Sequence, residues 1–222
     1  MSDRDDRRAD APRSEPVTQR ERRRPGPVDL AAAEGREIPD VIAPDLDILF
    51  CGINPGRWSG ATGHHFAHPG NRFWKALFAA GLTRELLSPD QGDQLLEMGL
   101  GVTNLVRRTT ASAAELTRDE LREGARTLAR TVGRWRPRVV AVLGLIAYRR
   151  AFDRPGAAPG EQPERLGDAR LWVLPNPSGL QGRYRLEDIV AELQNLRRAV
   201  DGRAGPGRTI DPSSERERPA GV

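Results

Sequence analysis

Cysteine and lysine each occur only once in the chain, and no hydrophobic run is long. Because Cys51 is the only cysteine, the chain can form neither an intrachain disulfide nor a cysteine-based metal cluster. Lys75, in the interior of a predicted helix, is the only lysine that could supply a catalytic amine. The longest apolar run, residues 139–148, is well below the ~20 residues that span a bilayer, and the first residues lack the apolar segment of a secretory signal. We therefore expect a cytoplasmic protein that does not bind a membrane.

Basic and acidic residues nearly balance, with 35 Lys and Arg against 31 Asp and Glu. The first forty residues hold nine Arg and ten acidic residues, and residues 201–222 hold four of each. Both ends are rich in Pro, Ala, Gly or Ser and lack apolar periodicity, so we expect disordered tails over 1–40 and 201–222. One folded domain is predicted over 41–200, with 22 basic and 17 acidic residues. That excess permits contact with a polyanion but does not prove it.

Short apolar segments alternate with helical patterns across this domain. We expect strands at residues 46–51, 101–105, 138–143 and 171–174, and helices at 71–80, 118–135, 145–152 and 186–200. The second helix has apolar residues at helical spacing, namely Leu121, Ala125, Leu128, Ala129 and Val132. Segment 153–168, rich in Pro and Gly, is expected to be a mobile surface loop. The alternation predicts an α/β fold, a three-layer α/β/α sandwich with a short, mostly parallel central sheet.

An asparagine follows the first predicted strand, in the motif Gly52-Ile53-Asn54-Pro55-Gly56. Pro55 disfavours helical backbone at Asn54, so the Asn54 side chain is expected to project beyond the sheet. Its amide offers two donors and an acceptor but is no base, so it can orient a water molecule and cannot deprotonate it. On its own, Asn-Pro-Gly is more often a simple turn.

The segment after this motif contains glycines, histidines and one phenylalanine. The glycines allow the backbone to approach a planar ligand or phosphate, although the segment is neither a P-loop nor a GxGxxG motif. Phe66 is a candidate for stacking a flipped base, although a single Phe is ordinarily a core residue. His64, His65 and His68 lack a CxxC or HExxH partner, so we expect no metal and no other cofactor.

A second rigid motif follows the last predicted strand, at residues 174–180 (LPNPSGL). Parallel strands end at the same edge of a sheet, so this loop and the Asn54 loop are expected to face one another across one cleft. Leu180 suits an apolar wedge that fills the space of an extruded base, and Arg183 suits a phosphate or guanine contact. For this motif alone, a turn leading into a helix is the more common interpretation.

The motifs GINPG, FAHPGNRFWK, GVTNLV and LPNPSGL, in this order, resemble those of the mismatch-specific uracil-DNA glycosylases and the related thymine-DNA glycosylases. The resemblance covers nearly all of residues 41–200. It implies that Asn54 orients the hydrolytic water and that Phe66 lies under the flipped base. It also implies that Ile53 and Gly56 line the base pocket through backbone groups, and that Ser59 lies near the pyrimidine edge.

The resemblance further implies a DNA-inserting wedge loop, formed by Asn176, Ser178, Gly179, Leu180 and Arg183. Arg183 stands three positions after the Ser-Gly-Leu wedge, where the family pattern has two. His64-His65 and the segment 104–110 (NLVRRTT) instead resemble the thymine-DNA glycosylase branch, which widens the range of candidate bases.

The expected function is a monofunctional DNA glycosylase, a monomer that removes uracil opposite guanine in double-stranded DNA, with ethenocytosine and thymine as further candidate bases. Strand cleavage through a lysine Schiff base is not expected, because Lys75 lies within a helix. Three alternatives remain open at this stage. They are a broader uracil-DNA glycosylase that also acts on U:A pairs and single strands, a non-catalytic protein that binds damaged or abasic DNA, and a small-molecule nucleotide hydrolase.

Overall fold

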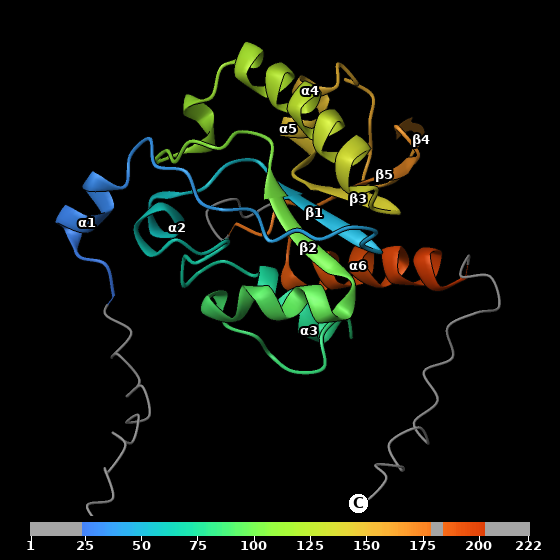
Figure 1. The fold of residues 1–222 in the computed structure, drawn as a ribbon, viewed down its shortest axis with the longest axis horizontal. Helices are drawn as coiled ribbons and strands as arrows, with labels where there is room; N and C mark the ends of the chain where they lie inside the picture. Colours follow the sequence, from blue (N-terminus) through green and yellow to red (C-terminus); the bar gives the residue numbers. More distant parts are fainter. Residues whose placement is uncertain (1–23, 179–183, 203–222) are drawn as a thin grey trace, which may run out of the picture.

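A computed structural model describes residues 24–178 and 184–202 of the chain (Figure 1). Five strands form one central sheet in the order β2-β1-β3-β5-β4. The strands are β1 (Ile48–Gly52), β2 (Leu100–Asn104), β3 (Val139–Leu143), β4 (Gly160–Leu166) and β5 (Ala169–Leu174). The first four in this order run parallel, and β4 pairs antiparallel with β5. The predicted α/β class with a mostly parallel sheet is therefore confirmed.

Helices cover both faces of the sheet and produce three layers (Figure 1). One face carries α3 (Phe73–Ala79), the 3-10 helix η1 (Pro89–Met98) and α6 (Leu186–Asp201), and the other carries α4 (Arg118–Trp135) and α5 (Leu145–Ala151). Successive β1 side chains alternate between the two cores. Ile48 and Phe50 pack toward α3 and α6, whereas Leu49 and Cys51 pack toward α4 and α5.

The structure differs from the sequence prediction at β4 and within α4. The expected loop at 153–168 contains edge strand β4, whose residues alternate between half-buried and exposed. An edge position also accommodates Pro163, which has no N–H to donate to a neighbour. In α4, Ala129 is exposed, and Gly124 is buried instead. A Cβ at Gly124 would collide with the Leu105 carbonyl, so this glycine lets α4 approach the end of β2.

Packed structure begins before residue 41, the expected start of the domain. Residues 24–40 include helix α1 (Pro27–Ala32), and both Ala33 and Ile38 are buried. Val41 then pairs with Val102 through two backbone hydrogen bonds of 2.9 and 2.7 Å. We refer to residues 33–41 as the strap, because they run from beside the helix α2 (Arg57–Thr62) along the β2 edge of the sheet to Val102.

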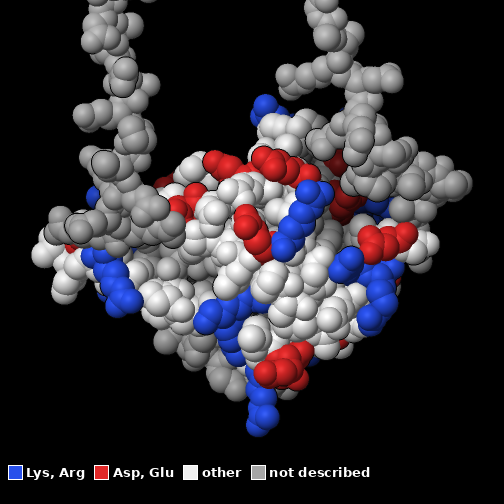
Figure 2. Space-filling view, turned by 90° about the horizontal axis from the view of Figure 1, so that it is seen from below, with Lys and Arg blue, Asp and Glu red and all other residues white. Residues whose placement is uncertain are grey.

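Charged side chains of both signs are interspersed on the face that carries α3 and α6 (Figure 2). The positive excess of residues 41–200 therefore does not gather into a single-signed patch on this face. No helix in the described part of the chain has the length and apolar character needed to cross a membrane.

Candidate functional site

Asn54 lies at the edge of the sheet where β1 and β2 end. The parallel pairing of the two strands continues past their ends, because Leu105 N–H donates to the Gly52 carbonyl and Val106 N–H to the Ile53 carbonyl, both at 2.9 Å. Thr110 N–H then donates to the Pro55 carbonyl at 3.1 Å. The loop after β1 and the segment 105–110 after β2 therefore lie side by side.

The Asn54 side chain is fixed by this neighbouring segment. Its Nδ2 group donates to Thr110 Oγ1 at 2.7 Å and to the Arg108 carbonyl at 3.1 Å, with the Pro55 carbonyl at 3.2 Å. The Thr110 hydroxyl donates its own proton to the Ser112 carbonyl at 2.9 Å, so it is free to accept from Asn54. Because carbonyl oxygens can only accept, the amide atom that faces the Arg108 and Pro55 carbonyls must be the donor Nδ2, and Oδ1 points the other way. Among the described residues Oδ1 has no partner, so it can accept a hydrogen bond from water.

The segment that holds Asn54 is itself anchored to the start of α4. Arg108 donates to both carboxylate oxygens of Glu120, at 2.6 and 3.2 Å. Glu120 also accepts from the Thr117 N–H at 2.9 Å, which caps the helix. The Arg108 hydrogen bond, followed by that from Thr117, lowers the pKa of Glu120 from 4.5 to about 2. Glu120 is therefore ionised at neutral pH and keeps Arg108 in place.

Phe66, the predicted base-stacking residue, lies beside the end of β1. Its backbone is in the left-handed region, with φ of 53°, which is rare for an aromatic residue and is often found at functional sites. The Phe66 ring packs on Phe73 with centroids 4.1 Å apart. A Cβ at Gly52 would collide with the Asn104 amide oxygen and lie 3.3 Å from Phe66. Gly52 is thus required for both side chains to reach across the end of β1.

His65 is buried, and its protonation state follows from its two partners. Its Nε2 lies 3.0 Å from the Pro39 carbonyl, which can only accept, so Nε2 carries a proton. Its Nδ1 then accepts from Asn104 Nδ2 at 3.3 Å. Burial lowers the pKa of His65, which favours this neutral form. Asn104 therefore enters the candidate site as an oriented amide next to Phe66.

The remaining predicted pocket residues have different surroundings. Ser59 is buried on α2, where its Oγ accepts from Ala67 N–H at 3.3 Å and so supports the histidine-containing loop. Gly56 is exposed at the amino end of α2. Ile53 packs against Gly144, where a Cβ would come within 3.0 Å of its Cδ1. The predicted pocket roles of these residues stay predictions.

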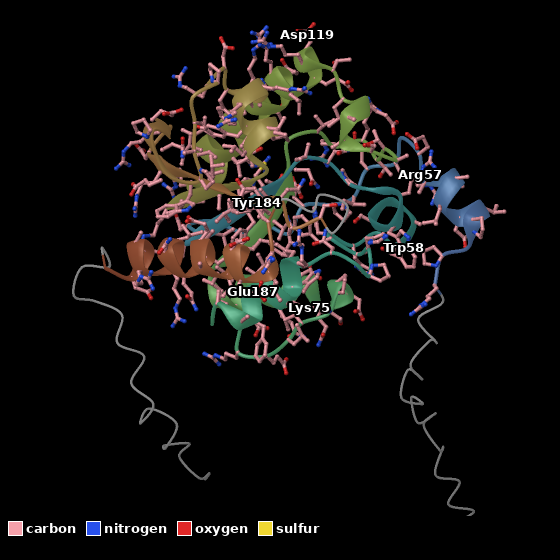
Figure 3. The ribbon with its side chains drawn as sticks, turned by 180° about the vertical axis from the view of Figure 1, so that it is seen from behind. Arg57, Trp58, Lys75, Asp119, Tyr184 and Glu187 are labelled. Atoms are coloured by element: carbon pink, nitrogen blue, oxygen red, sulfur yellow. The ribbon has the colours of Figure 1, made fainter. Side chains whose placement is uncertain are left out.

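The second predicted motif is held by an arginine that the sequence prediction missed. Asn176 Oδ1 accepts from Ser178 N–H at 2.9 Å, which forms a tight turn. Arg72 donates its backbone N–H to the Pro177 carbonyl and its guanidinium to the carbonyls of Ser178 and Tyr184. Arg72 therefore joins the two flanks of the segment 179–183. Its position within FAHPGNRFWK, as a charge beside aromatic residues, was the available sequence signal. Figure 3 labels Tyr184, one of these flanking residues, together with Lys75 on α3.

Gly179, Leu180 and Arg183 of the predicted wedge lie outside the described residues. The two predicted motifs do leave the sheet at the same edge, because β1, β3 and β5 are adjacent and parallel. The cleft expected between them stays a prediction.

A sequence comparison decides the classification of the chain. Residues 39–197 match the family described as the Uracil DNA glycosylase superfamily. The chain belongs to this superfamily. A solution NMR structure of a "putative uracil DNA glycosylase" from Methanosarcina acetivorans is similar, with a TM-score of 0.50, 19% sequence identity and coverage of 73% of this chain and 98% of that one. This likeness supports the fold of a superfamily member.

The structure also locates the single lysine and the side chains that could bind a metal ion. Lys75 is exposed on α3. No group of three or more His, Cys, Asp and Glu side chains in the described ranges is arranged to hold a metal ion. The amides of Asn54 and Asn104 and the hydroxyl of Thr110 lie at the site, and such groups can orient a water molecule.

Proposed function

We propose that this member of the uracil DNA glycosylase superfamily hydrolyses the N-glycosidic bond of uracil opposite guanine in duplex DNA. Ethenocytosine and thymine are further candidate bases, and the enzyme is proposed to act as a monomer without a cofactor. The observation that carries the proposal is the fixed Asn54 amide, whose Oδ1 has no partner among the described residues. The preference for G:U pairs rests on the resemblance of the four sequence motifs to the mismatch-specific branch.

In the proposed reaction, the base is extruded from the duplex and its ring lies against Phe66. The bond between sugar C1′ and the base nitrogen breaks, and both bonding electrons leave with the base. The water that is hydrogen-bonded to Asn54 Oδ1 then adds to C1′ and loses a proton to solvent. An amide suffices because positioning the water, and not deprotonating it, is the required contribution.

The loop after β5 is proposed to fill the space left by the base. Leu180 acts as the apolar wedge, and Arg183 contacts phosphate or the unpaired guanine. Asn176, Ser178 and Gly179 shape the loop, and the Arg72 contacts to Ser178 and Tyr184 support its two flanks.

Single-turnover cleavage of an end-labelled duplex with one U:G pair tests this function. Parallel substrates carry U:A, T:G, ethenocytosine:G or single-stranded uracil, each with and without alkali. We expect alkali-dependent breaks at U:G, and a loss of at least about 100-fold in Asn54→Ala, because a misplaced nucleophile costs this much. The exposed Asn195 on α6 provides a matched control, and Asn195→Ala should keep the full rate.

The other possible results identify the alternatives directly. Equal rates on U:A and single strands would replace mismatch specificity by a broader uracil-DNA glycosylase. Tight binding to abasic or mismatched duplex without any breaks would indicate a non-catalytic damage-binding protein. Breaks without alkali would indicate lyase chemistry, and Lys75→Ala would then test whether the single lysine supplies the amine.

A further inference from the structure

We propose that the strap, residues 33–41, is a positioning element that sets the orientation of two amides in the site, Asn54 and Asn104. The expected effect of the strap on catalysis rests on the proposed function, whereas the hydrogen bonds of the strap do not depend on it. The family match begins at residue 39, so most of the strap lies before it.

The first contact of the strap is with the segment that holds Asn54. Gly35 N–H donates to the Thr109 carbonyl at 3.0 Å, and Thr109 N–H donates to the Arg36 carbonyl at 2.8 Å. The residues on either side of Thr109, Arg108 and Thr110, supply two of the three acceptors of Asn54 Nδ2. Two backbone hydrogen bonds therefore fix the residue between the two groups that orient Asn54.

The second contact of the strap reaches Asn104 through His65. The Pro39 carbonyl accepts from His65 Nε2 at 3.0 Å and so sets the tautomer in which Nδ1 is an acceptor. Asn104 Nδ2 donates to that nitrogen at 3.3 Å. Without the Pro39 carbonyl, nothing in the described contacts would select this tautomer over the other.

The strap is itself well anchored, so it can transmit position to these loops. Glu34 accepts from Arg57 Nε at 3.0 Å, and Glu37 accepts from Arg107 Nε at 2.7 Å. Figure 3 shows Arg57 at the start of α2, close to α1. Ala33 and Ile38 are buried, at 0% and 4% exposure, which fixes the strap against the domain at two points.

Gly35 offers a way to loosen the strap without touching the site. Its φ is +74°, so a β-branched side chain there strains the backbone, and a Cβ built there meets no atom within 4 Å. Gly167 is the matched control, because its φ is also positive, at +59°. It lies between β4 and β5, at the edge of the sheet opposite to β2. Gly35→Ala provides a milder variant in case the valine prevents folding.

Two readouts are measured on the full chain, namely hydrogen exchange of the Thr109 amide and single-turnover base release at saturating enzyme. For Gly35→Val we expect exchange at least about 10-fold faster and release about 10-fold slower, with affinity for the duplex unchanged within about 2-fold. Gly167→Val should leave both readouts at wild-type values. In an Asn54→Ala background, Gly35→Val should slow release by less than about 2-fold, because Gly35 lies at the Thr109 contact, the contact of the strap that acts through Asn54.

Several results would overturn the proposal. The first is a Thr109 amide that already exchanges freely in the wild type. The second is a wild-type rate of base release in Gly35→Val despite faster exchange. The third is a loss of release rate in the double variant that equals the combined losses of Gly35→Val and Asn54→Ala. If the wild type releases no base, the proposed function fails separately. The proposed role of the strap is then tested by the NMR signals of the Asn54 and Asn104 side-chain amides. These signals should shift in Gly35→Val and stay in place in Gly167→Val. Unshifted signals in Gly35→Val would contradict the proposed role.

Discussion

Two neighbouring threonines at the site have the same side chain and different surroundings. Thr110 accepts from Asn54 and donates to the Ser112 carbonyl, so its hydroxyl has a partner in both roles. Thr109 is completely buried against Gly60, and its hydroxyl has no partner among the described residues. A polar group buried without a partner destabilises the fold, whereas the Thr110 hydroxyl contributes to the orientation of the Asn54 amide.

Thr110→Val is expected to slow base release by about 10-fold, because Asn54 Nδ2 loses its nearest acceptor and the amide can rotate. Thr109→Val is the matched control. It should keep the rate and raise the free energy of unfolding by about 1 kcal/mol, since it removes an unpaired buried hydroxyl. Single-turnover kinetics and urea unfolding of both variants test this. A similar loss of rate in the two variants would mean that Thr110 contributes only packing.

At the scale of elements, the loop after β5 depends on the segment before α3. Arg72 donates to carbonyls on both flanks of residues 179–183. The planar guanidinium can do so because its N–H groups point in fixed, different directions, whereas the ammonium group of lysine is a compact point charge. The wedge proposed for Leu180 requires such support, because an apolar side chain fills a gap in the duplex only when its backbone is held in place.

Arg72→Lys keeps the positive charge but loses the two separate N–H donors of the guanidinium. We therefore expect the rate of base release from duplex U:G to fall by about 10-fold, with unchanged salt dependence. Arg185→Lys is a suitable control, because Arg185 is exposed at the start of α6. Fluorescence of 2-aminopurine next to the uracil reports base extrusion directly. Normal extrusion in Arg72→Lys would contradict a role for this arginine in the wedge loop.

Elements with strong local patterns could be predicted from the sequence, whereas those that depend on pairing could not. The bounds of α4 agree fully, because its apolar spacing is local and Pro137 lies just beyond its end. Edge strand β4 was missed, because its residues (GEQPERL) show no apolar face and only the partner β5 makes them a strand. A loop rich in Pro and Gly was the natural interpretation of such a segment.

The same distinction applies to the candidate site. Asn54 could be singled out, because Pro55 constrains it and the surrounding motif is distinctive. Its acceptors on 108–110 could not, because they depend on the register that pairs Gly52 with Asn104. Residues 33–40 of the strap were assigned to a disordered tail, since their few apolar residues show no periodicity and most of their hydrogen bonds to the domain are made by the backbone.

For the whole molecule, the buried neutral His65 predicts a pH dependence of stability. Its pKa is lowered in the folded protein, so the unfolded chain takes up the proton first as the pH falls below 6.5. The free energy of unfolding should therefore decrease from about pH 7.5 to about pH 5, above the range where most carboxylates titrate.

Urea unfolding across this pH range measures the effect. His65→Gln is the informative comparison, because glutamine can donate to the Pro39 carbonyl and accept from Asn104 but does not titrate. The slope of stability against pH should be smaller in this variant. An identical slope in both proteins would assign the pH dependence to other groups.

The strand order β2-β1-β3 also has a consequence for biosynthesis. β1 lies between β2 and β3, yet β3 begins at Val139, long after β1 has been translated. Until β3 emerges from the ribosome, one side of β1 presents unpaired backbone groups next to Ile48, Leu49 and Phe50, an arrangement that favours pairing with other chains. The nascent chain therefore still has one unpaired edge of β1 while α4 is being synthesised, after β2 is already available to pair with the other edge.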